Sequence, residues 1–90
     1  MKLIANAFKI QDMLVFNGMD GYGWSGCIIT NSAVTGLVYE NNKIPGHMVG
    51  EFNLPGLSNK VIIKAKYLDT FYRKLENKIN KLGGKAYTRI

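Results

Sequence analysis

Three lysines in the last third of the chain are spaced in a way that suits binding to phosphate groups. Lys74, Lys78 and Lys81 stand at positions i, i+4 and i+7, which share one side of an α-helix. Several cations within reach of one anionic backbone are what neutralisation of nucleic-acid phosphates requires. Lys64 and Lys66 would extend the row if their segment lies beside the helix. The pattern therefore predicts a binding face, and a solvated helix face that only confers solubility is the alternative interpretation.

Other basic and aromatic side chains are candidates for the same surface. Tyr22 and Trp24 lie in the Gly-rich stretch 18–26, where they could stack on unpaired bases, because every base has a π-face. A tryptophan beside a tight loop also often closes one end of an apolar core, and this alternative stays open. The complete set of predicted binding residues is Lys64, Lys66, Arg73, Lys74, Lys78, Lys81, Lys85, Arg89, Tyr22 and Trp24.

The side chains that usually carry catalysis are few and scattered. His47 is the only histidine and Cys27 the only cysteine, and a cysteine beside Ile28 and Ile29 is typical of a buried, inert thiol. The acidic residues do not have the spacing of metal ligands. We therefore expect no enzymatic activity, no catalytic residue, no metal ion and no cofactor. A small nuclease or toxin that works with lysine, arginine and tyrosine stays a third hypothesis.

The charge of the chain is concentrated at its C-terminal end. Residues 1–59 carry three basic and four acidic side chains, whereas residues 60–90 carry nine and two, so this last third supplies the whole net charge of +6. Such asymmetry indicates an anionic partner, either DNA or RNA or an acidic protein surface. The first hypothesis is a small non-enzymatic nucleic-acid-binding module. The second is a protein-binding inhibitor or assembly factor that docks on an acidic surface of a host complex or self-associates.

The composition also bears on location. No run of apolar residues is long enough to span a membrane, and the single cysteine allows no intrachain disulfide. We therefore expect a cytoplasmic protein without membrane contact. The abundance of Lys, Asn and Ile is typical of AT-rich genomes, which include many phages, so the host cytoplasm is the expected location if the protein is viral.

Short β-branched and aromatic segments separated by turn residues predict a β-meander over residues 1–57. Asn17-Gly18 has the composition of a hairpin turn, and Asn31-Ser32 separates two segments that would form a second hairpin. Gly36 inside the second of these segments suggests a bulge or a bend. The expected strands are 2–9 at an edge of the sheet, 13–16, 24–30, 33–40 and 48–54 at another edge.

The C-terminal region changes from strand periodicity to helix periodicity. Residues 60–67 alternate between apolar and lysine side chains, which favours a half-buried strand over a helix that begins at Ser58. An apolar stripe at helical spacing predicts a helix over residues 68–82, on which Asp69 and Arg73 would form an ion pair. Residues 86–90 would add a final short strand. We expect a single α+β domain over residues 1–90: a small curled antiparallel sheet of about five strands packed against one C-terminal amphipathic helix.

Overall fold

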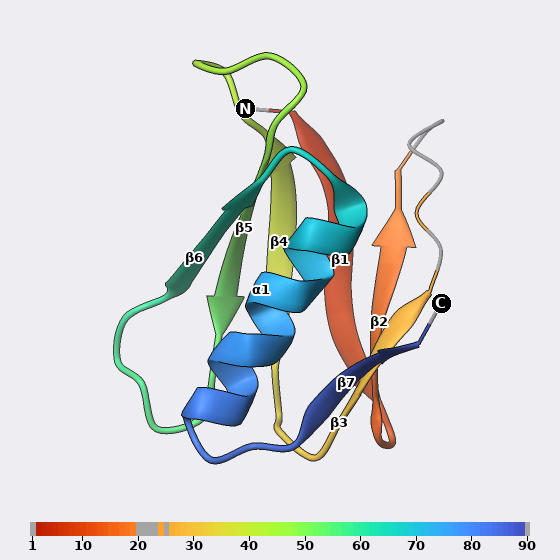
Figure 1. The fold of residues 1–90 in the computed structure, drawn as a ribbon, viewed down its shortest axis with the longest axis vertical. Coiled ribbons are helices and arrows are strands. Elements are labelled where there is room, and N and C mark those ends of the chain that lie inside the picture. Colours follow the sequence, from red (N-terminus) through yellow and green to blue (C-terminus); the bar gives the residue numbers. More distant parts are fainter. Residues whose placement is uncertain (1, 20–23, 25, 90) are drawn as a thin grey trace.

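A computed structural model describes residues 2–19, 24 and 26–89 of the chain. One α-helix packs on a curled antiparallel sheet, so the α+β class expected from the sequence is confirmed, but the sheet has seven strands rather than about five (Figure 1). The elements are β1 (Leu3–Ile10), β2 (Met13–Gly18), β3 (Cys27–Thr30), β4 (Thr35–Glu40), β5 (Met48–Asn53), β6 (Val61–Ala65), α1 (Leu68–Lys81) and β7 (Ala86–Arg89).

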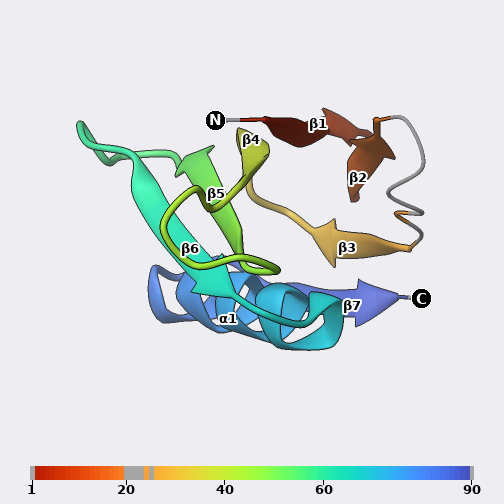
Figure 2. The same cartoon turned by 90° about the horizontal axis from the view of Figure 1, so that it is seen from above.

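The strand order is β6-β5-β4-β1-β2-β3-β7, so the first strand of the chain lies at the centre of the sheet. The strands β2 and β3 extend the sheet on one side of β1, and β4, β5 and β6 extend it on the other side. The helix then carries the chain from the β6 edge to the β7 edge. Because the sheet is strongly curled, α1 lies across its open side and between its two edges (Figure 2).

The first hairpin turns at a different place from the one predicted. The strands β1 and β2 pair from Ala5 opposite Gly18 to Ile10 opposite Met13, so the turn is Gln11-Asp12, and Gln11 has a φ of 53°. The prediction of a turn at Asn17-Gly18 is wrong, because these two residues continue β2 opposite β1. Leu14 and Phe16 are buried in this register. Core packing therefore decides where the chain turns and overrides the local turn preference of Asn-Gly.

Two further pairings differ from the sequence prediction. The strands β3 and β4 do not form a hairpin, since β3 pairs with β2 and β7 while β4 pairs with β1 and β5. Likewise β1 and β5 are interior strands and not edge strands. Gly36 is not at a bulge, because the irregular pairing lies in β1, between Leu3 and Ala5. The sequence pattern of a strand shows that a segment is extended but not which distant segment pairs with it. Here β7 pairs with β3, in the position predicted for β4.

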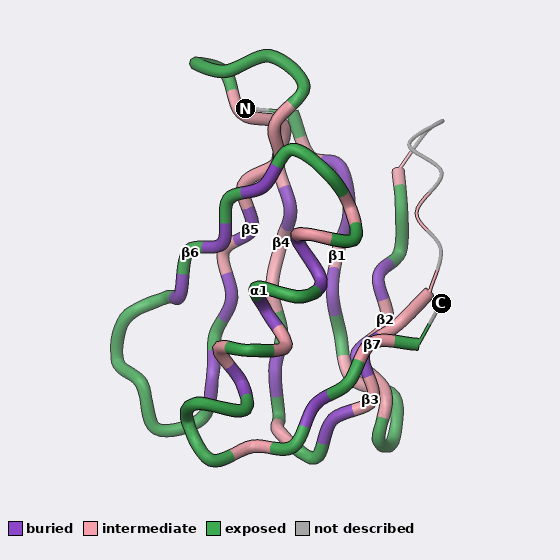
Figure 3. The backbone as a smooth tube through the Cα atoms, in the orientation of Figure 1, coloured by how far each residue is buried: buried purple, intermediate pink, exposed green. Residues whose placement is uncertain are grey.

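The core lies between the concave side of the sheet and α1 (Figure 3). Irregular pairing in β1 allows two consecutive residues, Ile4 and Ala5, to be buried together. The helix contributes Phe71, Tyr72, Leu75 and Ile79, all of which are fully or almost fully buried. Partners from the sheet include Leu14, Phe16, Ile28, Val38, Phe52 and Ile63.

The C-terminal elements determine where the basic residues lie. Val61, Ile63 and Ala65 are buried while Ile62 and Lys64 are exposed, so the segment that follows Lys60 is a strand, and the alternative of a helix from Ser58 is wrong. The helix α1 ends where Gly83 takes a φ of 91° and the Gly84 N–H donates to the Ile79 carbonyl at 3.0 Å. Among the described residues, no helix has the length and apolarity to cross a membrane.

Candidate nucleic-acid interface

One flank of α1 binds the outer edge of β7. The Asn80 side chain donates to the Ala86 carbonyl at 2.9 Å and accepts from the Ala86 N–H at 2.7 Å. Glu76 Oε2 accepts from the Thr88 N–H at 3.0 Å and from the Thr88 hydroxyl at 2.7 Å. These side chains satisfy backbone groups that an edge strand otherwise presents to solvent. The flank that faces β7 is therefore structural.

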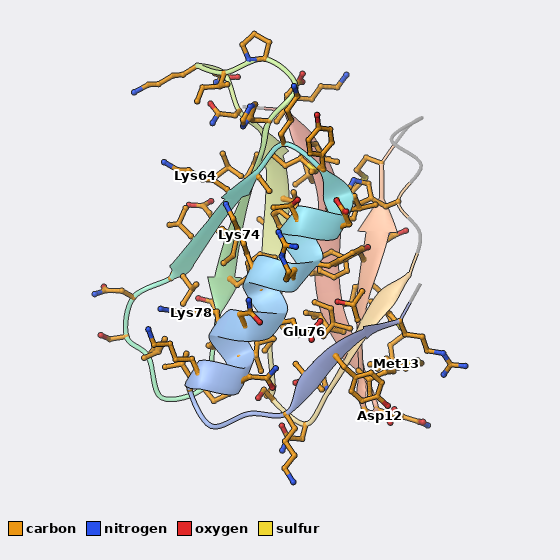
Figure 4. All side chains as sticks on the ribbon, viewed as in Figure 1. Asp12, Met13, Lys64, Lys74, Glu76 and Lys78 are labelled. Atoms are coloured by element: carbon orange, nitrogen blue, oxygen red, sulfur yellow. The ribbon has the colours of Figure 1, made fainter. Side chains whose placement is uncertain are left out.

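The opposite flank of α1 faces β6 and carries lysines. Lys74 Nζ donates to the Lys64 carbonyl at 2.7 Å, which joins the helix to the other edge of the sheet. Figure 4 shows Lys64, Lys74 and Lys78 on this side of the helix, away from Glu76. Lys74 and Lys78 of the helix and Lys64 of β6 therefore lie on one side of the molecule, as the sequence pattern requires for one shared surface.

We call this surface the lysine face and define it as Lys60, Lys64, Lys74, Lys78 and Lys81. From Lys74 to Lys81 the face extends about 10 Å along the helix axis, which is about the axial length of three nucleotides of one strand. All of these side chains are exposed except that of Lys78, which is half-buried.

The acidic residues of the last third are occupied elsewhere. Glu76 binds Thr88, as described above, and Asp69 Oδ1 accepts from the Thr70 N–H at 2.8 Å. The predicted ion pair between Asp69 and Arg73 does not form, although both residues lie in the part of the chain that is described. Neither carboxylate therefore neutralises the lysine face. The nearby acidic residue Glu51 of β5 lies opposite Ile62 and lines a depression with Lys60, so it borders only the Lys60 end of the face.

A shallow groove lies beside β6, between Lys60 and Lys78 of the lysine face. Its volume is about 410 Å³. Lys60 and Lys78 contribute its charge, and the exposed apolar side chains of Leu57 and Ile62 contribute its apolar lining. The remaining lining residues are Ser58, Asn59, Val61 and Ile63.

Several predicted binding residues lie apart from the lysine face. Lys66 Nζ is 5.4 Å from the centre of the Tyr67 ring and lines a different depression, together with Glu40 and His47. Arg89 belongs to β7, at the far edge of the sheet from β6. Arg73 and Lys85 are exposed, the first on the solvent side of α1 and the second between α1 and β7.

Trp24, in the Gly-rich stretch, packs against the aromatic side chains of the core. The Trp24 ring stacks on Phe16 with a centroid distance of 5.3 Å and meets Phe71 and Tyr72 edge-on at 5.7 and 5.9 Å. Trp24 thus closes one end of the core, which is the alternative considered for it. Tyr22 lies outside the described residues.

Cys27 and His47 lie at different parts of the sheet. Cys27 lies on β3 and His47 precedes β5, with β2, β1 and β4 between these two strands in the sheet. Within the described residues, no group of three or more His, Cys, Asp or Glu side chains could hold a metal ion.

The sequence pattern predicted the lysine row but not the contacts of Glu76 and Asn80 with β7. These two residues have the i, i+4 spacing of a shared helix side, and both flank the apolar stripe. The position of β7 beside them was not visible from this spacing alone.

Comparison with protein-family models, with curated proteins and with solved structures found no match to this chain.

Proposed function

We propose that this protein is a non-enzymatic nucleic-acid-binding module whose lysine face contacts the phosphate backbone. One observation carries the proposal: β6 and α1 bring five lysines onto one surface, and the two acidic side chains of the same region bind to Thr70 and Thr88 instead. Lysine is a mobile point charge that suits phosphate groups and not the bidentate reading of a base. Binding with little dependence on base sequence follows.

The position of Trp24 favours a backbone-directed mode of binding. Its ring packs against Phe16, Phe71 and Tyr72 and is only partly exposed, so little of it is available for stacking on unpaired bases. Single-stranded binding proteins gain much of their affinity from such stacking. The supported substrate class is thus a nucleic acid whose phosphates are regularly spaced, as in a duplex.

The salt dependence of binding tests this proposal. Five phosphate contacts predict that the logarithm of the association constant for a DNA duplex falls with the logarithm of salt concentration at a slope of about −4.5. The double variant Lys74→Gln/Lys81→Gln should reduce the slope by about 2. Titration of a fluorescent duplex at several salt concentrations measures both values. A slope near zero, or one that the double variant leaves unchanged, contradicts the proposal.

The groove beside β6 supports a second candidate function. Leu57 and Ile62 are 42% and 47% exposed and lie beside Lys60 and Lys78 in the same groove. An acidic protein surface that inserts an apolar side chain would use both features, whereas a phosphate backbone would use only the lysines. This candidate is a protein-binding inhibitor or assembly factor that docks on an acidic surface.

A pair of apolar substitutions separates the two candidates. Leu57→Ser and Ile62→Ser remove the apolar lining and leave every lysine in place. Duplex binding should stay within about twofold of the wild type if phosphates are the ligand, because these contacts are electrostatic. A loss of duplex binding in these variants, comparable with that of the lysine variants, would argue against phosphate recognition.

A further inference from the structure

The outer, convex side of the sheet carries an apolar patch that no element of the described chain covers. We call it the outer patch, and it spans β1, β2, β3 and β7. Alternation along these strands places Leu14, Ile28 and Ala86 in the core and their neighbours on the outside. The pairing then gives two cross-strand rows, Phe8–Val15–Cys27–Arg89 and Ile10–Met13–Ile29–Tyr87.

The outer patch is unusual for a surface that only faces water. Seven of its eight side chains are apolar or aromatic, and Phe8, Ile10 and Tyr87 are 39%, 46% and 60% exposed. Antiparallel sheets with one solvated face normally alternate apolar and polar residues, so that the outer face is polar. A contiguous apolar patch of this kind marks an interaction site.

A second chain is not expected to associate by pairing a strand with either edge of the sheet. At the β7 edge, Asn80 and Glu76 bind the outward backbone groups of Ala86 and Thr88. At the β6 edge, Lys74 occupies the carbonyl of Lys64, and the neighbouring lysines repel a second copy of the same strand. Association through the described chain is therefore expected face to face.

Charges at the margins of the outer patch indicate what covers it. Arg89 ends one row on β7, and Asp12 in the β1–β2 turn borders the other row at the opposite corner. The two are three residues and two strands apart, roughly 14 Å by standard strand spacing. Figure 4 shows Asp12 and Met13 across the molecule from Lys64, Lys74 and Lys78. An apolar surface with one cation and one anion at diagonal corners is complementary to itself.

We propose that a second copy of this chain covers the outer patch in a two-fold symmetric dimer. Two-fold symmetry makes the same patch serve on both subunits, so the apolar rows of one subunit are buried across those of the other. Arg89 of one protomer then faces Asp12 of its partner, and both pairs form at once. Two stacked sheets with interdigitating side chains are an established packing arrangement. The lysine faces remain exposed in the dimer, so the concentrated positive charge does not oppose association.

Sedimentation equilibrium of the purified protein tests the dimer. The wild type should sediment as a species of twice the 10.1 kDa chain mass. Ile10→Lys should weaken dimerisation by at least about tenfold, because it places a charge inside the apolar interface. The matched control is Ile62→Lys, a similarly exposed isoleucine on β6, outside the patch. Unchanged far-ultraviolet circular dichroism verifies that each variant is folded.

A charge exchange tests the orientation of the two copies. Arg89→Asp and Asp12→Arg should each weaken the dimer, and the double variant should restore it, because the pair is re-formed with opposite sign. A wild type that stays monomeric at 100 µM or so, the upper range for a moderately weak dimer, overturns the inference. A dimer that Ile62→Lys weakens as much as Ile10→Lys, or a double variant no stronger than the single ones, overturns it as well.

Discussion

In the sequence Glu76 looks like an ordinary surface charge of the helix. In the structure its carboxylate holds β7 against α1. Its carboxylate receives two hydrogen bonds from Thr88 and thereby fixes β7 to α1. Hydrogen bonds to a charged acceptor are stronger than neutral ones. The same contact removes an acidic group from the neighbourhood of the lysines, so it contributes to stability and to the charge asymmetry at once.

Replacement of Glu76 should therefore destabilise the protein more than replacement of an exposed helical residue. Glu76→Ala is expected to lower the free energy of unfolding by about 1–3 kcal/mol, because two donors of Thr88 lose their partner. Asn77→Ala, an exposed position one residue further along, is the control and should change stability by less than about 0.5 kcal/mol. Urea denaturation followed by circular dichroism measures both. An equal change in the free energy of unfolding at the two positions would show that the Glu76–Thr88 contact does not stabilise the protein.

Tyr72 predicts how stability responds to alkaline pH. Burial raises the pKa of Tyr72 from 10.0 to about 12, with a further contribution from Cys27. The folded state thus holds the phenol proton between pH 10 and 12 while the unfolded state releases it. The stabilisation from the retained proton is present below pH 10 and is lost as pH rises through this interval, by at most about 3 kcal/mol.

The measurement is the pH dependence of urea unfolding between pH 8 and 12. Tyr72→Phe should flatten the alkaline decline, since no phenol proton remains at this position. Tyr67→Phe is the control at an exposed tyrosine and should leave the decline as in the wild type. An alkaline decline in Tyr72→Phe as steep as that of the wild type would contradict the assignment.

At the scale of elements, two glycines allow α1 to approach the sheet. A Cβ atom on Gly36 would lie 2.4 Å from the Phe52 ring, and one on Gly50 would lie 2.4 Å from Phe52 and 2.5 Å from Phe71. Such distances are far below van der Waals contact. Gly36 and Gly50 thus make room for the aromatic rings that join β5 to the helix.

Gly50→Ala is expected to lower the free energy of unfolding by about 1–3 kcal/mol through overpacking. In the background of Phe52→Leu the same substitution should cost less, because one of the two obstructing rings is gone. It should still cost something, since Phe71 remains. The double-mutant cycle is measured by thermal or urea unfolding. Identical costs in both backgrounds would refute the role assigned to Phe52.

The elements of this fold were more predictable than their arrangement. The helix, the lysine row and the strand that precedes the helix follow from periodicity within a few consecutive residues. The pairing of β3 with β7 and the central position of β1 depend on contacts between distant segments, which local patterns do not encode. For the same reason the sequence pointed to Lys74 and Lys78 but gave no indication that Glu76 and Asn80 hold the opposite edge.

At the scale of the whole molecule, the two flanks of α1 have different roles. One of its flanks completes the sheet at β7, and the other joins β6 to form the lysine face. The outer patch lies on the convex side of β1, β2, β3 and β7. A dimer through the outer patch would carry two lysine faces, which allows two contacts with one long nucleic acid.

The measurement that tests the central claim most directly compares two variants of equal net charge. Lys74→Glu/Lys78→Glu reverses two charges on the lysine face, and Arg73→Glu/Lys85→Glu reverses two exposed basic side chains that lie apart from it. Duplex affinity is measured by fluorescence anisotropy at a fixed salt concentration. If the lysine face binds phosphates, the first variant should lose at least about a hundredfold in affinity and the second less than about tenfold. Equal losses would show that only net charge matters and would contradict a localised binding face.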